Sequence, residues 1–479
     1  MAEIITGAND VLWSGLLIFL LCGTGIYFTF RLRFIQIRKF AEAWKMLFRP
    51  PKSDRRSGEM TPVQALATAV AAQVGTGNLA GAATAIVSGG PGAIFWMWVS
   101  AFFGMATIYA EATLAQKFRI EVNGEVTGGP AYYIRAAFSG KFGRALSLIF
   151  AACCCLALGC MGNMVQANSI GSAFSSVLST IGVSVPALSV GGLSISVPAL
   201  IVGAIVAAAA GFVFFGGTQR LAKTVVRVVP AMAAVYILGG LLFIAMNATE
   251  IPAAFRLIFV GAFDPQALAG GALGVTVREA IRYGVACGLF SNEAGMGSTP
   301  HAHARAAVRD PHRQGLIALL SVFIDTFLIL NLTVLVVLTS GVLDFSGNAG
   351  AGMLAAAPSG IALTQAAFAS CFGAFGGIFV AFCLLFFAFS TILGWHFFGE
   401  VNFKYLFRGH GAKLYSLAVI AFILTGTTLK VDLVWQLADF FNGLMVLPNL
   451  LALIVLAKAV SAISRRSTAG MPPLPPENS

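Results

Sequence analysis

Charged residues are scarce in this sequence. They make up 10% of the 479 residues, whereas hydrophobic residues make up 58%, and the mean hydropathy is +0.86. Soluble globular proteins carry about 25% charged residues, so this composition argues against a water-soluble domain. One stretch, 61–88, has no Asp, Glu, Lys or Arg at all. We therefore expect an all-α polytopic membrane protein, because helices satisfy their own backbone polar groups inside a bilayer.

Patterns typical of cross-links, metal centres and enzymes are also missing. The eight cysteines lie in apolar runs without a CxxC pair, which argues against a disulfide framework or a zinc site. His301 and His303 are two residues apart, so on a helix they point in different directions and we expect them to be solvated or interfacial. The sequence shows no nucleophile–base pair. It predicts no cofactor and no enzymatic activity.

Apolar runs long enough to cross a bilayer recur along the chain. About 20 apolar residues span the hydrocarbon core of a membrane. No Lys or Arg precedes the first run, which argues against a cleaved signal peptide. We count eleven candidate spans, at 11–31, 62–88, 92–116, 145–180, 197–216, 224–247, 268–300, 315–341, 361–400, 412–429 and 433–458.

The basic residues predict how these spans are oriented. If the amino terminus lies outside and the spans alternate, the inside receives 26 of the 30 Lys and Arg residues, which is the bias of the positive-inside rule. We therefore expect a cytoplasmic carboxyl terminus in a bacterial or archaeal-type plasma membrane. The same bias accounts for the net charge of +11, because the basic residues gather on the cytoplasmic side of the lipid bilayer. The charge therefore does not indicate nucleic acid as a partner. The four outer exceptions are Arg256, Arg278, Arg282 and Lys430.

Two of the spans are interrupted by glycines and polar residues. The second span breaks at 74–78 and the seventh at 291–297. Backbone groups freed from a helix cost several kcal/mol each in lipid, so such a break survives where it lines a cavity. Either break alone could instead reflect glycine-mediated helix packing or a simple kink. The seventh span comes five spans after the second, and because five is an odd number the two cross the membrane in opposite directions. Their matching positions therefore predict two inverted repeats with a binding site at the membrane midplane.

This pattern divides the chain into four predicted parts. An extra transmembrane helix and a cytoplasmic linker occupy 1–58. Five spans form the first repeat at 59–248, and five form the second at 249–460. We expect the remaining 461–479 to be a disordered cytoplasmic tail.

Four runs carry a resemblance to a known family. The runs are QVGTGNLAGAATAIVSGGPGAIFWMW (73–98), GMATIYAEATLAQKFR (104–119), GNMVQAN (162–168) and GLFSNEAGMGSTPHAHA (288–304). With these runs, the sequence at 59–458 resembles the alanine/glycine:cation symporter family, whose fold is similar to that of the leucine transporter. The resemblance implies uptake of alanine or glycine coupled to sodium or protons.

The two breaks suggest which residues contact the substrate. Free N–H groups at the start of a half-helix suit a carboxylate, so we assign that role to Asn78 and the backbone of Thr76 and Gly77. An Asn that merely caps a helix is the alternative. Trp395 would close the pocket over a small side chain, unless it is an interfacial Trp. The other predicted contacts are Gln166, Ser291, Asn292, Gly295, Met296 and Thr391.

The resemblance also implies a sodium site. Its ligands would be the carbonyl oxygens of Ala71 and Val74 and the hydroxyls of Ser390 and Thr391. Alternatively, each hydroxyl bonds a carbonyl of its own helix, as helical Ser and Thr often do.

Three of the carboxylates within predicted spans need an explanation, because charge in a membrane is expensive and rarely idle. We expect Glu111 to bind backbone groups or a nearby base. For Glu293 we favour holding the unwound backbone over binding an ammonium group or relaying a proton. The role of Asp325 stays open.

The sequence therefore predicts a secondary transporter that works by alternating access. Sodium-coupled uptake of alanine or glycine is the preferred interpretation. A symporter of another small metabolite on the same fold, coupled to sodium or protons, is the alternative. A channel is disfavoured because neither a repeated filter nor a ring of charges is present.

Overall fold

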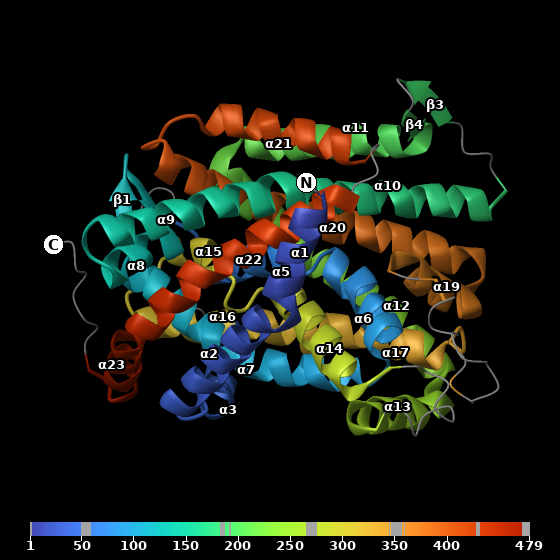
Figure 1. Cartoon of the computed structure of the whole chain (residues 1–479), viewed down its shortest axis with the longest axis horizontal. Helices are drawn as coiled ribbons and strands as arrows, with labels where there is room; N and C mark the ends of the chain where they lie inside the picture. Colours follow the sequence, from blue (N-terminus) through green and yellow to red (C-terminus); the bar gives the residue numbers. More distant parts are fainter. Residues whose placement is uncertain are drawn as a thin grey trace.

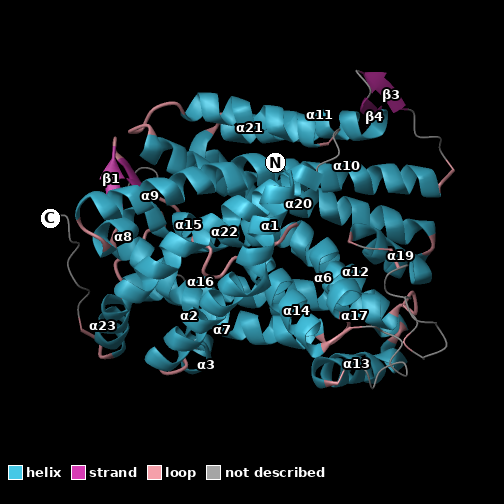
Figure 2. Ribbon diagram, viewed as in Figure 1, coloured by secondary structure: helices cyan, strands magenta, loops and turns pink. Residues whose placement is uncertain are grey.

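The structure is almost entirely helical (Figure 2). It is a computed structural model that describes residues 2–48, 59–182, 187–190, 193–264, 275–343, 345, 357–358, 360–427 and 432–471. Within these ranges the strands form two antiparallel hairpins, β1 (Ile120–Val122) with β2 (Glu125–Thr127) and β3 (Ala187–Val190) with β4 (Leu193–Ser196). The hairpins lie at opposite ends of the molecule (Figure 1), as expected if one span separates them.

The first half of the chain begins with the extra amino-terminal helix and continues through the first broken helix. Its helices are α1 (Ala2–Val11), η1 (Leu12–Leu16), α2 (Leu17–Arg31), α3 (Ile35–Arg38), α4 (Phe40–Phe48), α5 (Pro62–Gln73), η2 (Gly77–Gly81), α6 (Ala82–Gly89), α7 (Ala93–Lys117), α8 (Pro130–Ala137), α9 (Gly140–Cys154), η3 (Cys155–Gly162), α10 (Asn163–Thr180), α11 (Val197–Phe214) and α12 (Gly217–Met246).

The second half contains the second broken helix and ends in a short terminal helix. Its helices are η4 (Ala248–Glu250), α13 (Ile251–Phe263), α14 (Val277–Asn292), α15 (Pro300–Ala304), α16 (Pro311–Val322), η7 (Phe323–Leu330), α17 (Asn331–Thr339), α19 (Ile361–Phe372), α20 (Ala374–Leu406), α21 (Ala412–Gly426), α22 (Asp432–Val455) and α23 (Ala457–Thr468).

Every predicted span contains at least one of these helices. Among the described residues, seven helices are long and apolar enough to cross a membrane, and the bent pair of α5 with η2 and α6 brings the number to eight. Shorter apolar helices include α2, α19 and α21. The all-α membrane fold is confirmed, whereas the number of eleven spans stays a prediction.

A single long helix runs through the middle of the molecule. The segments α9, η3 and α10 join end to end over 41 residues, Gly140–Thr180. The 33-residue helix α20 packs along this helix, and α11 and α21 lie side by side on its outer face (Figure 1). Helix α7 packs against α14 and α16. The two broken helices meet between these groups.

Three predicted boundaries need correction. The span at 361–400 is two helices, α19 and α20, because Gly373 between them has φ +58°, a conformation that few residues other than glycine adopt. The second break begins later than predicted, since α14 stays helical through Asn292 and the chain turns helical again only at Pro300.

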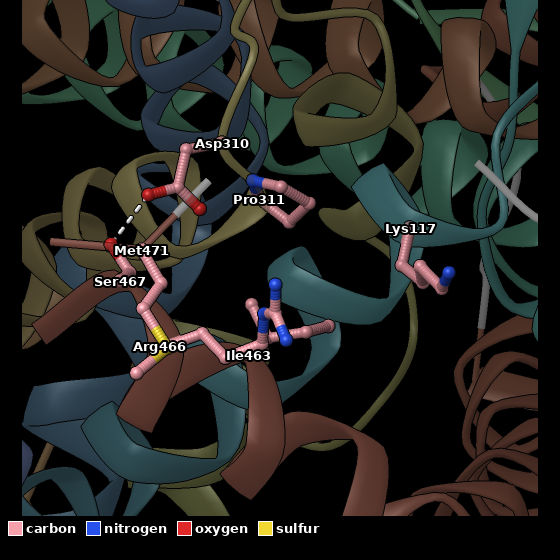
Figure 3. A pocket seen from close by; sticks show the side chains of 7 residues that line it. All are labelled: Lys117, Asp310, Pro311, Ile463, Arg466, Ser467 and Met471. Carbon is pink, nitrogen blue, oxygen red and sulfur yellow. Dashed lines mark hydrogen bonds between the residues drawn. The ribbon is translucent and has the colours of Figure 1, made fainter. Parts of the chain in front are cut away.

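The predicted disordered tail at 461–479 is also wrong in its first part. Helix α23 continues to Thr468, and residues 472–479 lie outside the described ranges. Ser467 Oγ donates a hydrogen bond of 2.5 Å to Asp310 Oδ2, just before α16 (Figure 3). Ile463 is buried at the same contact. Docking of this amphipathic helix explains why it is ordered despite its polar composition.

Candidate functional site

The first break is a sharp turn between two well-defined helix ends. Helix α5 starts at a capping box, in which Thr61 and Gln64 each bond the other's backbone N–H, and it carries Pro62 at its first position. It stops where Val74 takes an extended conformation, with φ −80° and ψ 91°. The chain turns helical again at Gly77, and the two halves differ in direction by 50°. The break predicted at 74–78 is thus confirmed, although it is shorter.

The second break depends on three residues in the left-handed region. Glu293, Gly295 and Gly297 have φ of +55°, +86° and +82°. Glycine accepts this conformation freely, whereas at Glu293 it costs on the order of 1–3 kcal/mol and needs support from its surroundings. Strain of this kind is concentrated at functional sites.

The two breaks touch each other. Gln73 Nε2 at the end of α5 donates to Asn292 O at the end of α14, at 2.6 Å. A Cβ atom at Gly77 would lie 3.3 Å from Ser291 Cα, so glycine permits this close approach. The predicted substrate residues of both breaks therefore belong to one site.

Asp325 connects both breaks from a third helix. It lies on the π-helical segment η7 and is fully buried. Asn78 Nδ2 donates to Asp325 Oδ1 at 2.7 Å, and Ser291 Oγ lies 3.0 and 3.1 Å from the two carboxylate oxygens. Thr326 Oγ1 donates to Oδ2 at 3.0 Å. The residue whose role the sequence left open thus ties the first broken helix to the second.

Asn78 also fixes the first turn. Its Oδ1 accepts a hydrogen bond of 3.0 Å from the backbone N–H of Gly75. The next N–H, of Thr76, donates to Gln166 Oε1 on α10 at 3.3 Å. Gly77 is the first residue of η2, and the first N–H groups of a helix have no partner within that helix. This free donor points to an anionic group as its ligand, because a helix start favours negative charge.

Glu111 stabilises the unwound backbone of the second break. Its carboxylate accepts from the backbone N–H groups of Gly295, at 3.1 Å, and Gly297, at 2.9 Å. Asn449 Nδ2 donates to the same carboxylate at 2.7 Å and to Gly295 O at 2.9 Å. The expectation that Glu111 binds backbone is confirmed, while the role of Asn449 was not expected.

Glu293 is held from two sides. Trp395 Nε1 on α20 donates to its Oε1 at 2.6 Å, and Ser298 Oγ donates to its Oε2. The Trp395 ring lies against Gly162, where a Cβ atom would come within 2.5 Å of the ring. Glu293 therefore links the unwound segment to the Trp that was predicted to close the pocket. The favoured structural role for Glu293 agrees with these contacts.

Four oxygens converge where α20 passes the end of α5. Thr391 Oγ1 lies 3.1 Å from Ala71 O and 3.3 Å from Val74 O, and Ser390 Oγ lies 3.3 Å from Ala71 O. For a hard cation with oxygen ligands about 2.4 Å away, neighbouring ligands at right angles are about 3.4 Å apart. The three contacts among the four groups named by resemblance, at 3.1–3.3 Å, are thus compatible with ligands of one cation.

The protons in this cluster are too few for its oxygens. Both hydroxyls also face Phe387 O, at 2.8 Å from Ser390 and 3.1 Å from Thr391. Each hydroxyl carries one proton, so Thr391 cannot satisfy three carbonyl oxygens at full strength. A cation between the oxygens would remove the repulsion among them. The alternative of bonding within the helix is therefore compatible with a cation site, because the proton can go to Phe387 O.

The side chains of the site are buried. The predicted side chains are at most 4% exposed, and that highest value belongs to Trp395, whereas Gly77 is partly exposed. Met296, 2% exposed, is the apolar member. Three π-helical segments, η2, η3 and η7, contribute to or adjoin the site, and such segments are frequent at functional sites.

Comparison with known proteins shows to which family this chain belongs. The model described as "Sodium:alanine symporter family" matches residues 1–469. The sodium/alanine symporter AgcS of Methanococcus maripaludis is 40% identical over 460 residues, covering 96% of this chain and 95% of that protein. This chain belongs to the sodium:alanine symporter family. As a member of this family it is a cation-coupled amino-acid transporter of the membrane and not an enzyme.

Other similarities agree with this membership. The probable sodium/glutamine symporter GlnT of Bacillus subtilis is 39% identical over 480 residues, covering 99% of this chain and 93% of that protein. The crystal structure of MhsT in complex with L-phenylalanine superposes with a TM-score of 0.58 at 13% identity, covering 87% of this chain and 99% of that one. The predicted leucine-transporter-type fold of this sodium:alanine symporter family member is thereby confirmed.

Proposed function

We propose that this protein is a sodium-coupled symporter that carries alanine or glycine into the cell by alternating access. The observation that carries the proposal is the oxygen cluster of Ala71, Val74, Ser390 and Thr391, which directly adjoins the first break. The ion site and the substrate site share one short segment of backbone. Binding of either ligand would order that segment for the other.

The substrate carboxylate would bind at the start of η2. The free N–H of Gly77 and the positive end of the helix suit it, and Thr76 lies beside them. Asn78 would act by holding the turn, through Gly75 and Asp325. Carbonyl oxygens at the end of α14 would receive the ammonium group, next to Ser291 and Asn292. Gln166 would complete the polar contacts.

The walls of the site favour a small side chain. Trp395 lies against Gly162, and Met296 is buried in the opposing break. A substrate with no more than a methyl side chain would fit between these groups with little displacement. Larger substrates would have to move the Trp395 ring and break its bond to Glu293.

Sodium would supply the driving force. Alanine and glycine are electrically neutral, so one sodium ion per cycle carries one charge inward. At about 100 mV, inside negative, this is worth about 2.3 kcal/mol. With 1.36 kcal/mol for each factor of ten, the potential alone supports roughly 50-fold accumulation. The inward electrochemical gradient of sodium gives the cycle its direction.

Uptake into proteoliposomes tests the proposal. Purified protein should accumulate labelled alanine when sodium is high outside, and an equal potassium gradient should drive none. Unlabelled glycine should compete with alanine. Gradient-independent uptake that does not saturate would instead indicate a channel.

Glutamine and protons belong in the same experiment. A relative with 39% identity is named as a probable sodium/glutamine symporter, so labelled glutamine is the direct competitor. Accumulation of glutamine without alanine would refute the substrate assignment while leaving sodium coupling intact. Accumulation driven by a proton gradient in sodium-free buffer would refute the ion assignment.

A further inference from the structure

A basic cavity lies between the two ends of the chain, away from the substrate site. It has a volume of about 320 Å³ and is lined by the end of α2, the turn into α3, and α23. One water needs about 10–15 Å³, so the cavity can hold a much larger group. Four arginines line it, and none of its lining residues is acidic: Arg31, Arg33, Arg38 and Arg465.

Two of these arginines build the cavity. Arg31 Nε donates to Ala457 O at 3.1 Å and to Ser461 Oγ at 2.9 Å, which joins α2 to α23. Arg38 Nε donates to Arg33 O at 2.6 Å, and its second nitrogen reaches Leu32 O at 3.1 Å. These bonds hold the turn, in which Arg33 and Phe34 both have φ +56°. Two adjacent left-handed residues are costly, so the turn depends on this support.

The other two arginines remain free to bind a ligand. The side chains of Arg33 and Arg465 are exposed and make no hydrogen bond or ion pair with the residues that the structure describes. Ser464 and Thr468, also on α23, add hydroxyl groups to the lining. A guanidinium group offers five donors in a plane, which suits the oxygens of a phosphate. The chemistry of the cavity is therefore that of a phosphate site.

The surroundings identify the source of that phosphate. Phe30, Phe34 and Ile37 alternate with the arginines along the chain and are 64%, 36% and 60% exposed. Such side chains on a membrane protein face lipid tails. The arginines thus stand where an apolar lipid-facing surface ends, and most Lys and Arg residues of the chain are predicted on the same side. A lipid would place its phosphate in the cavity and its acyl chains on the aromatic surface.

We infer that this cavity binds the phosphate headgroup of an anionic phospholipid. The bound headgroup would join the extra amino-terminal helix to the terminal helix α23, because its phosphate would be shared by Arg33 and Arg465. Basic pockets at the cytoplasmic ends of membrane helices bind such headgroups by the same combination of charge and apolar surface. The site is separate from the transport site, so it holds or fails independently of the proposed substrate.

Native mass spectrometry of delipidated protein in detergent tests the inference. The probes are phosphatidylglycerol, phosphatidylcholine and inorganic phosphate, each titrated alone. We expect phosphatidylglycerol to bind at least about tenfold more tightly than phosphatidylcholine, since an anionic surface is worth about a factor of five per arginine. Equal binding of the two lipids would overturn the inference. So would inorganic phosphate binding as tightly as phosphatidylglycerol, which would make the ligand a free anion.

Matched variants locate the site. The double substitution Arg33→Gln with Arg465→Gln should weaken phosphatidylglycerol binding about 30-fold, and either substitution alone about fivefold. Arg144→Gln on α9 removes an exposed arginine that is not part of the cavity and should leave binding unchanged. Equal losses in the double variant and the control would overturn the assignment. If the double variant fails to fold, the two single variants carry the test, because neither side chain supports a hydrogen bond of the described structure.

Discussion

The side chain of Asn78 joins two elements that are 247 residues apart in the sequence: its Nδ2 lies 2.7 Å from Oδ1 of Asp325. The same Asn caps the N–H of Gly75, so the turn in the first broken helix and the carboxylate on η7 are fixed relative to each other. Ser291 of the second broken helix donates to that carboxylate as well. A change in any of these three side chains should therefore be felt in both half-helices.

Asn78→Ala should abolish alanine uptake while leaving a folded protein. It removes a donor from Asp325 and an acceptor from Gly75, and leaving such buried groups unpaired costs about 1–3 kcal/mol each. Thermal unfolding and proteoliposome uptake measure the two effects. Asn247→Ala is the control, because that side chain bonds Phe243 O and Cys371 Sγ and has no bond to either broken helix among the described residues. Normal uptake by Asn78→Ala would refute the role of this turn.

Thr391→Val should raise the sodium concentration needed for half-maximal alanine uptake by at least about tenfold. Bonds to charged groups are worth about 1.5–3 kcal/mol, and the variant keeps the shape while losing the oxygen. Thr339→Val is the matched control, since the one partner of its buried hydroxyl among the described residues is Leu335 O on its own helix. An unchanged sodium dependence would show that Thr391 is not a ligand.

Gly162→Ala should push the Trp395 ring from its place. The new methyl group would stand 2.5 Å from the ring, so the ring must shift and its bond to Glu293 must lengthen or break. Overpacking of this kind costs about 1–3 kcal/mol, and uptake should fall with it. Gly377→Ala on α20 has no atom within 4 Å of the new group and should behave as wild type. Tryptophan fluorescence, thermal unfolding and uptake together check the prediction.

Glu111→Gln should destabilise the backbone of the second break, although the new side chain has nearly the same size and shape. One carboxylate oxygen would become an NH₂ group facing backbone N–H groups or the Asn449 amide, so at least one buried donor loses its acceptor. We expect a loss of about 1–3 kcal/mol in the free energy of unfolding and slower transport. The exposed Glu250→Gln serves as the control. Equal stability of the two variants would contradict the role given to Glu111.

The predicted cytoplasmic position of the carboxyl terminus can be checked with fusions to that end of the chain. A fused fluorescent protein that folds only in the cytoplasm should fluoresce, and a fused alkaline phosphatase that needs an oxidising compartment should be inactive. The opposite pair of results would show that the span count or the direction is wrong.

The fold was largely predictable from the sequence, because its signals are local. Apolar runs, glycines and basic residues are read directly along the chain, and they located both breaks within a few residues. Boundaries were less accurate. The apolar run at 361–400 continues through Gly373, whose conformation separates α19 from α20, so the composition of the run does not mark the boundary between the two helices.

The network around the site was harder to predict, because it depends on long-range contacts. Asp325 could be recognised as a lone carboxylate in an apolar run, but two of its three donors, Asn78 and Ser291, come from other helices far away in the sequence. The same applies to Asn449 beneath Glu111. His301 and His303, expected to be solvated or interfacial, are buried at 1% and 0% exposure. His301 bonds Ser298 O and Asn402, and His303 bonds Gln314, so tertiary packing supplies the partners that water was expected to provide.

The joined helix of α9, η3 and α10 is much longer than a membrane is thick. At 1.5 Å per residue, its 41 residues measure about 60 Å, twice the roughly 30 Å of a hydrocarbon core. Such a rod must lean steeply or project well beyond the lipid. Its midpoint falls near residue 160, inside η3 and close to Gly162 and Gln166. A rod centred in the bilayer would hold a ligand at this point at similar diffusion distances from the two sides, so small helix movements would decide the side of exit.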